Sequence, residues 1–458
     1  MATEAGRPAS LLTAVEGYVG DRSNERTATG ITRKGLSIKV SLLANRPPQP
    51  SKLWVHCPEA VHVDTPRVLC TAGDLILFRV DVSPDCVPRT AVSRCGGIAT
   101  TSSTAPTPPQ FTVLTLLDDM RTRGFEDNEI GILPRGLYHY TIAVLLPGPL
   151  SFKEFVLHLF HSETSSWTST VLPVAEPQVE FDWFIPTNTD LYYDYTSNII
   201  TIGGEHGTMG WVDLWRGILL CDVLREKPTL RGIPLPLPME HITRGEHLGR
   251  AMDHRGIAMG ELCVAVVNGC LKLVHLVDAW AISSWSNSTL ENSYEAWGEP
   301  ECTVEAAEVA IGTDMISQPS GMLLLPSEEG VENPEQEAAY LQRLVISDPS
   351  PSLDDDGVVY LIAREKLYHP KSWILALDMN TKTLQSVFPF GTVEEPSESI
   401  MYCTSRCMPF FPAAVDLELA EVLACGRAVQ LATKMNARKL LLETDSLSTT
   451  SKIRWCLK

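Results

Sequence analysis

The chain has 458 residues and a formal net charge of -19, from 37 basic and 56 acidic side chains. This acidic balance argues against a surface that binds nucleic acid phosphates or anionic membranes in general. Hydrophobic residues make up 44% of the chain, which is typical of globular proteins. No apolar run approaches the roughly 18 residues that a membrane-spanning helix needs. We therefore expect a folded protein that makes no contact with a membrane.

Residues 1–10 carry Glu4 and Arg7 and lack the continuous apolar stretch of a secretory signal. We expect this segment to be disordered and the protein to be cytoplasmic or nuclear. Twelve cysteines are scattered along the chain without the density of a small disulfide scaffold, so reduced thiols are expected.

Residues 11–400 consist mainly of short apolar runs separated by Gly, Pro, Asp and Ser, a pattern typical of β sandwiches, barrels and propellers. Four strands are predicted at 199–202, 209–213, 218–222 and 230–233, with turns between them. Four antiparallel strands in about 35 residues make one propeller blade. The sequence thus predicts a mainly β fold built from repeated four-stranded antiparallel blades.

A weak repeat supports this arrangement. The tetrads at 165–168 (SSWT) and 283–286 (SSWS) are near copies, and Trp167 and Trp285 lie 118 residues apart, or two units of 59. Such a period suits blades with long loops. Hairpin turns are predicted at 161–164 and 378–381, and counting such hairpins gives five or six blades. An irregular two-sheet sandwich is the alternative.

Three segments interrupt the strand pattern. Residues 96–110 are rich in Ser, Thr and Pro and are predicted to form a loop. Residues 326–339 carry five glutamates and are predicted to be a solvated acidic loop. Asp354, Asp355, Asp356 and Gly357 precede an apolar run and are predicted to form a turn, without the ligand spacing of a calcium loop.

The run at 210–224 (GWVDLWRGILLCDVL), with Leu230 and residues 233–236 (IPLP), is the most specific motif in the chain. It resembles a plant family catalogued as domain of unknown function 1618. Stretches at 20–22, 55–58, 266–274, 353–360 and 376–385 resemble the same family, so the resemblance covers roughly residues 10–400. It implies a plant protein with no established activity.

The residues of this motif have a structural interpretation. Trp211 and Trp215 are predicted to pack between blades, and Arg216 with Gly217 to close a turn. Asp213 and Asp222 are predicted to bind backbone donors at strand ends.

The character of the sequence changes near Ala413. Residues 413–458 carry seven basic and five acidic side chains, and apolar residues recur at helical spacing from Leu417 onward. A helix over 417–435, capped by Asp416, and a strand over 438–444 are predicted. A linker at 401–412 is therefore expected to lead to a short α/β fragment.

This fragment resembles the plant ribonuclease-H-like domain, in which a helix Glu and a strand-end Asp help to hold two divalent cations. Glu421 and Asp445 match these two positions. The resemblance implies Mg²⁺, nucleic acid binding and cleavage of RNA–DNA hybrids. However, residues 401–412 lack the earlier acid, and the final acid does not follow before Lys458. We interpret the fragment as truncated and expect no cofactor unless it is functional.

Histidines offer little further chemistry. Three acid–His pairs, at 240–241, 246–247 and 253–254, have spacings that match no helical face. His158 and His161 lie three apart on a predicted strand and should point to opposite faces. The sequence therefore predicts a non-catalytic interaction or scaffold module with an unidentified protein partner. A nucleic acid binding protein or ribonuclease acting through Glu421 and Asp445 is the alternative.

Overall fold

The computed structural model describes residues 11–73, 75–83, 95–100, 111–114, 126–136, 139–148, 154–173, 196–214, 217–236, 260–277, 281–288, 290, 294–311, 343–366, 372–391 and 401–403. Within these ranges, no helix has both the length and the apolar character needed to cross a membrane. The 3-10 helices described there are η2 (Asp127–Glu129), η4 (Tyr294–Trp297) and η5 (Ala306–Glu308).

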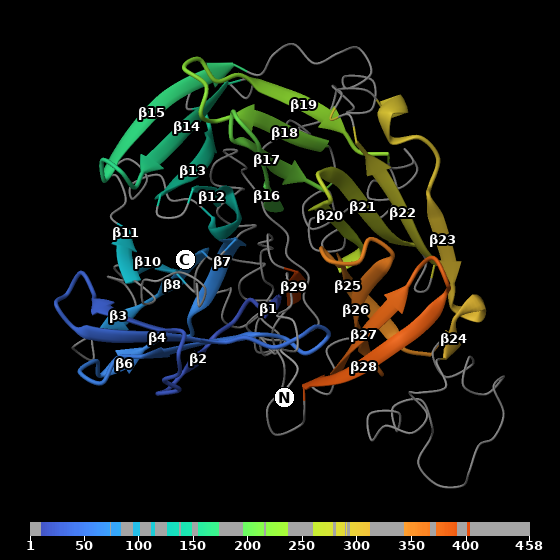
Figure 1. The fold of residues 1–458 in the computed structure, drawn as a ribbon, viewed down its shortest axis with the longest axis horizontal. Coiled ribbons are helices and arrows are strands. Elements are labelled where there is room, and N and C mark those ends of the chain that lie inside the picture. Colours follow the sequence, from blue (N-terminus) through green and yellow to red (C-terminus); the bar gives the residue numbers. More distant parts are fainter. Residues whose placement is uncertain are drawn as a thin grey trace, which may run out of the picture. The chain divides into compact units, whose positions relative to one another are not determined.

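The described strands include five runs of four antiparallel strands, which we call blades 1 to 5 (Figure 1). Blade 1 comprises β7 (Arg67–Ala72), β8 (Leu75–Val80), β10 (Cys95–Thr100) and β11 (Phe111–Leu114). Blade 2 comprises β12 (Ile130–Arg135), β13 (His139–Pro147), β14 (Glu154–His161) and β15 (Ser166–Pro173). Blade 3 comprises β16 (Asn198–Gly203), β17 (Thr208–Asp213), β18 (Gly217–Asp222) and β19 (Leu230–Pro234).

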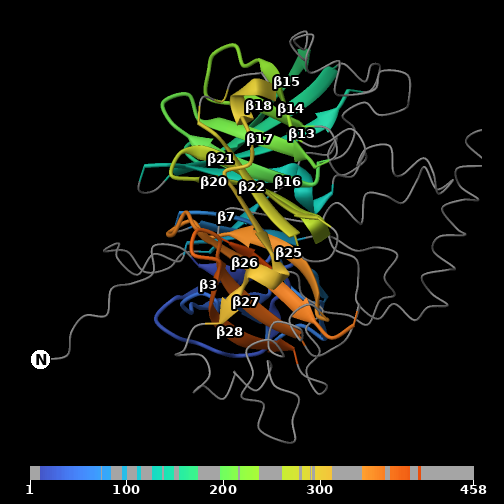
Figure 2. The same ribbon diagram turned by 90° about the vertical axis from the view of Figure 1, so that its right-hand side faces the viewer.

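Blade 4 comprises β20 (Leu262–Val267), β21 (Cys270–Val277), β22 (Ala281–Asn287) and β23 (Cys302–Glu305). Blade 5 comprises β25 (Val345–Pro351), β26 (Val358–Arg364), β27 (Ser372–Asp378) and β28 (Thr383–Gly391), with β24 (Ala310–Ile311) parallel to β28. The first strands of consecutive blades contact one another from β7 to β25, and the blades lie face to face (Figures 1 and 2). This is a propeller-like arrangement.

The remaining strands form three further sheets. One sheet has the order β2 (Tyr18–Val19), β5 (Lys52–His56), β4 (Ser37–Leu43) and β3 (Thr27–Ile31), with β2 parallel to β5. Strand β6 (His62–Val63) pairs with β9 (Val82–Ser83). Strand β1 (Leu12–Ala14) pairs with β29 (Met401–Cys403), which joins the first and last described strands of the chain.

Alternating side chains of each blade fill two different cores. In β17, Met209 and Trp211 pack toward blade 2, whereas Val212 packs toward blade 4. The same division separates blades 1 and 2 and blades 4 and 5. Because both faces of a central blade are covered, its strands read as nearly continuous apolar runs in the sequence.

The main prediction about the fold is confirmed. The strands expected at 199–202, 209–213, 218–222 and 230–233 are β16 to β19 of blade 3. The turns expected at 161–164 and 378–381 lie at hairpins between β14 and β15 and between β27 and β28. The expected disordered segment 1–10, the acidic loop 326–339 and the α/β fragment 413–458 lie outside the described residues. Of the expected linker 401–412, the structure describes residues 401–403, which form β29.

Two predictions were wrong. Residues 96–100, expected in a loop, belong to β10, because the backbone of this glycine-containing stretch pairs with β8 on one side and β11 on the other. The SSWT and SSWS tetrads are not structural equivalents, since Trp167 lies in the fourth strand of its blade and Trp285 in the third. Blades 2 to 5 begin at Ile130, Asn198, Leu262 and Val345, so their spacings are 68, 64 and 83 residues rather than 59.

Candidate functional site

Trp211 lies at the centre of β17 and is fully buried in the core between blades 2 and 3. Its indole Nε1 donates a hydrogen bond to the backbone carbonyl of Glu129, at 3.4 Å, on the blade 2 side. A buried aromatic ring with its polar atom bound to a neighbouring blade stabilises the contact between the two sheets. In this position Trp211 acts as a packing residue.

The two motif aspartates lie at strand ends of the same blade. Asp213 is fully buried at the end of β17, opposite Gly217, the first residue of β18. Asp222 ends β18, where its Oδ1 accepts a hydrogen bond from Thr208 Oγ1 at 2.7 Å and its Oδ2 pairs with Arg225 Nε at 2.9 Å. These are side-chain donors rather than the backbone donors expected for Asp222. Trp215 and Arg216 lie outside the described residues.

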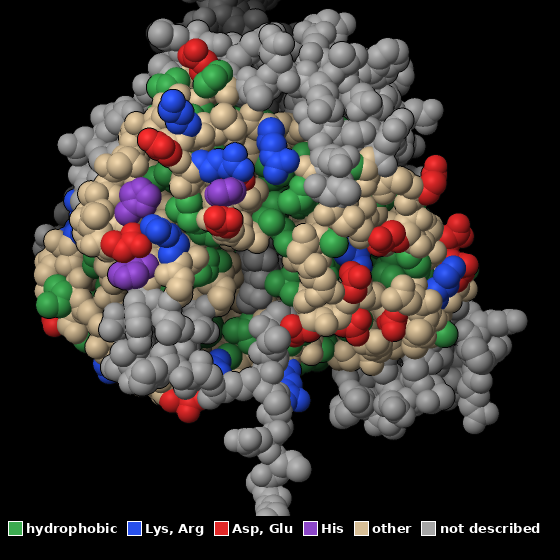
Figure 3. All heavy atoms as spheres, turned by 45° about the horizontal axis from the view of Figure 1, so that its top comes forward, with side chains coloured by type: hydrophobic (Ala, Val, Ile, Leu, Met, Phe, Trp, Pro, Cys, Tyr) green, Lys and Arg blue, Asp and Glu red, His purple; other side chains and the backbone are tan. Residues whose placement is uncertain are grey.

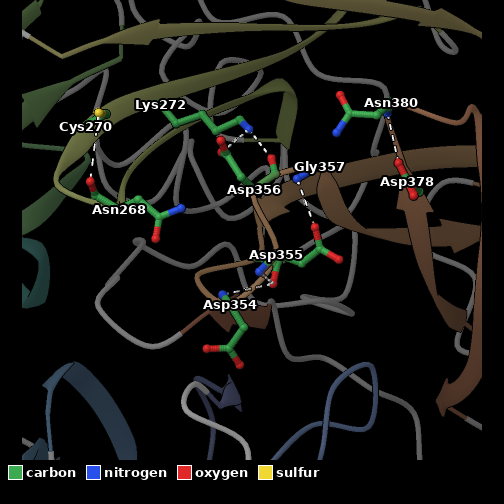
Figure 4. Close-up of polar contacts among 10 residues, drawn as sticks. Asn268, Cys270, Lys272, Asp354, Asp355, Asp356, Gly357, Asp378 and Asn380 are labelled. Atoms are coloured by element: carbon green, nitrogen blue, oxygen red, sulfur yellow. Dashed lines mark hydrogen bonds and ion pairs between the residues drawn. The ribbon is translucent and has the colours of Figure 1, made fainter.

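A charged contact joins blades 4 and 5 (Figure 4). Lys272 of β21 is only 5% exposed, and its Nζ donates hydrogen bonds to the backbone carbonyl of Asp356 and, at 2.7 Å, to the Asp356 carboxylate. The Asp356 side chain, in the turn between β25 and β26, is 61% exposed. The sequence motifs at 266–274 and 353–360 thus meet through one lysine and one aspartate.

The turn that holds Asp356 is organised by its own side chains. Ser352 Oγ accepts hydrogen bonds from the backbone N–H groups of Asp354 and Asp355, and Asp355 Oδ1 accepts one from the Gly357 N–H at 3.2 Å. At Gly357 a Cβ atom would collide with the side-chain amide of Asn380, so a larger residue there would require that amide to move. The expectation that residues 354–357 form a turn leading into a strand is therefore met by β26.

Asp378 fixes the adjacent hairpin turn (Figure 4). Partial burial opposes ionisation of its carboxyl, but hydrogen bonds from Thr381, Asn380 and Gln385 outweigh burial and lower the pKa of Asp378. This carboxylate is thus occupied in holding the turn between β27 and β28.

The 3-10 turn η2 connects three blades. Asp127 pairs with Arg79 at 2.8 Å and with Arg67 at 3.8 Å, both in blade 1. Asn128 is buried and donates a hydrogen bond to the backbone carbonyl of Thr196, just before blade 3. Burial raises the pKa of the Glu129 carboxyl to about 7. Nothing in the sequence marks this turn as special, because Asp-Asn-Glu is an ordinary polar stretch before an apolar strand.

The predicted metal and catalytic residues are not among the described residues. Glu421 and Asp445, with the Mg²⁺ that they would help to hold, are outside the described residues, as are the three acid–His pairs at 240–254. His158 is buried and shares a hydrogen bond with Ser169 Oγ at 2.8 Å, whereas His161 is partly exposed on the opposite face of β14. In the described part of the chain, no group of three or more His, Cys, Asp or Glu side chains could hold a metal ion.

The surface in Figure 3 carries separated charges of both signs. Basic, acidic and His side chains lie close to one another on the left of this view, and acidic side chains predominate on its right. The described part of this face therefore presents small charged groups rather than a continuous basic surface.

Residues 211–360 match the model of a family described as "Protein of unknown function (DUF1618)". The matched region begins at Trp211 in blade 3, contains Lys272 and Asp356, and ends within β26. A search of curated proteins gives no match.

Two solved structures are weakly similar to the chain. A Trypanosoma rangeli sialidase in complex with the inhibitor DANA has 10% sequence identity and a TM-score of 0.26, over 92% of this chain and 63% of the sialidase. The WD40 domain of SCAP from fission yeast has 11% identity and a TM-score of 0.23, over 79% of this chain and 76% of that one. The chain thus spans less than two thirds of the sialidase. At these TM-scores neither similarity carries an argument about function.

Proposed function

We propose that the β unit is a member of the DUF1618 family and that the protein is a non-catalytic interaction or scaffold module in the cytoplasm or nucleus. The family match from blade 3 to blade 5 supports the first part of this proposal. The propeller-like fold supports the second, because such folds present turns and outer strands of a rigid framework to other proteins.

The observation that carries the proposal is the placement of distinctive residues of the matched region at contacts between blades. Trp211 fills the core between blades 2 and 3, and Lys272 binds Asp356 across blades 4 and 5. Side chains used in this way set the positions of neighbouring sheets. They support a surface rather than contact a substrate.

The charge of the chain indicates the kind of partner. A net charge of -19 attracts basic protein surfaces and increases their rate of encounter, whereas it repels nucleic acid phosphates and other acidic surfaces. We therefore expect a protein partner with a basic binding surface, and an affinity that weakens as salt is added.

The test is reconstitution of a binary complex from the purified full-length chain and a partner identified by cross-linking in cells. We expect stoichiometric binding that persists in EDTA and after nuclease treatment. The rival function is tested in parallel with an RNA–DNA hybrid and Mg²⁺. Hybrid cleavage by the wild-type chain that is lost in Glu421→Gln and Asp445→Asn, with no protein partner found, would overturn the proposal in favour of a ribonuclease.

A further inference from the structure

Strand β15 presents an unusual outer edge. It is the last strand in the order of blade 2, and the described residues provide no strand on its other side. Its sequence, SWTSTVLP, contains no charged residue, and six of its eight residues are exposed. Val171 is 58% exposed, one of the larger apolar side chains at the surface. A long, uncharged and exposed edge strand can pair with another chain.

The outer strands of blades 3 and 5 are partly covered. On β19, Trp297 Nε1 donates a hydrogen bond to the Pro234 carbonyl at 2.8 Å, and the Arg231 side chain donates one to the Leu290 carbonyl at 2.8 Å. Strand β24 pairs in parallel with Thr383 and Leu384, at the beginning of β28. Other segments of the same unit therefore contact both of these edges.

The outer strands of blades 1 and 4 are protected in other ways. Phe111 of β11 lies directly against Gly30 of β3, so the neighbouring sheet packs over the edge of blade 1. Strand β23 has only four residues, and the exposed Glu301 and Glu305 lie before and at the end of it. Short length and charge both discourage edge pairing. Among the described blades, β15 is thus the long outer strand on which no other described segment packs or pairs along its edge.

We propose that the edge of β15 binds an extended segment of a partner protein as an additional strand of blade 2. Every second residue of an edge strand directs its backbone N–H and C=O groups outward, and an added strand satisfies them. On one face of β15 the exposed Val171 lies beside the added strand, whereas the Trp167 ring packs against Phe160 with 5.4 Å between centroids; the other face presents Thr168 and Thr170. The bound segment therefore carries β-branched and apolar side chains in its centre.

Charge selects between a different protein and a second copy of this chain. Glu154 lies opposite Pro173 at one end of the edge, and at the other end Glu163 is paired with Arg135 at 3.1 Å. The local charge is negative, and two copies would each carry a net charge of -19. Like charges oppose self-pairing, whereas basic residues flanking the bound segment complement Glu154. The occupant is thus a basic-flanked, uncharged strand of another protein.

This inference rests on the proposed interaction function and is tested on the full-length chain. The probe is a synthetic peptide with five alternating Thr and Val residues between pairs of lysines. Its control has the same sequence with alternate backbone nitrogens methylated, so that strand pairing is blocked. Binding is measured by fluorescence anisotropy, and hydrogen exchange locates the protected residues. We expect protection of residues 166–173 by the first peptide and none by the second.

The variant Val171→Lys places a charge on the edge, and Val61→Lys is the matched control, since Val61 is 61% exposed in a turn. We expect roughly tenfold weaker peptide binding in Val171→Lys and less than about twofold change in Val61→Lys, with both melting temperatures unchanged. Equal binding by both variants, or protection outside β15, would overturn the inference. A dimer of the peptide-free chain that is lost in Val171→Lys would also overturn it, by assigning the edge to a second copy.

These experiments distinguish failure of the edge inference from failure of the proposed interaction function. If Val171→Lys still binds the partner identified for the wild-type chain with unchanged affinity, the edge inference fails and the interaction function stands. Failure to find any protein partner counts against the proposed function, even where the peptide binds β15.

Discussion

Removal of the Asp356 carboxylate should destabilise the β unit more than removal of the lysine that it binds. Lys272 is 5% exposed. In Asp356→Ala its ammonium group would keep its hydrogen bond to the backbone carbonyl of residue 356, but water could not fully hydrate it. Breaking a fully buried pair in this way costs about 3–5 kcal/mol. Because the Asp356 side chain is 61% exposed, solvent screens this pair, and we expect a loss of about 1–2 kcal/mol.

The reverse substitution, Lys272→Met, leaves a different group without its partner. The Asp356 carboxylate is exposed enough to be hydrated, and the methionine chain can occupy much of the space of the lysine stem between blades 4 and 5. We therefore expect the free energy of unfolding to change by less than about 1 kcal/mol.

Urea unfolding followed by tryptophan fluorescence measures both effects, and the double variant gives the coupling between the two residues. Glu226→Ala, which removes an exposed acid from a turn of blade 3, controls for the change in net charge. A larger loss in Lys272→Met than in Asp356→Ala would refute this reasoning, because it would show that the lysine contributes mainly through packing or a net favourable ion pair.

Three further predictions concern the core, a carboxyl group and the end of the β unit. Trp211→Ala should reduce the free energy of unfolding by about 3–5 kcal/mol, and Trp211→Phe by less, in the same urea assay, because the ring fills a core between two blades; an unchanged midpoint would contradict this packing role. For Glu129, burial raises the pKa from 4.5 to about 7 in the folded state, so the associated stability is complete below pH 4.5 and is lost as the pH rises to about 7. Its size is up to about 3 kcal/mol, and Glu129→Gln should remove this pH dependence when unfolding is compared at pH 4.5 and 7.5; an identical slope in both proteins would contradict the assignment. Truncation after Pro409, where the contacts divide the chain, should change the melting temperature little, whereas truncation after residue 400 removes β29 and its pairing with β1 and should lower it; equal melting temperatures would show that this pairing is unimportant.

The sequence alone was sufficient to locate blade 3 and to predict a mainly β, propeller-like fold. Its strands are buried on both faces and are separated by short polar turns, so local composition marks where each strand begins and ends. The turn at 354–357 and the opposite orientations of His158 and His161 follow from equally local rules. These features depend on residues close together in the chain, and the sequence contains that information directly.

Long-range pairing decided the features that sequence analysis missed. Strand β10 begins Cys-Gly-Gly and has few large side chains, and it is a strand because β8 and β11 lie on either side of it. The near-identical tryptophan tetrads occupy different strands of their blades, since unequal loops shift the sequence relative to the fold. Likewise, Lys272 meets Asp356, and η2 joins three blades, only when the sheets are stacked. The exposed edge of β15 depends on the same stacking, because a strand has an uncovered edge only relative to its neighbours.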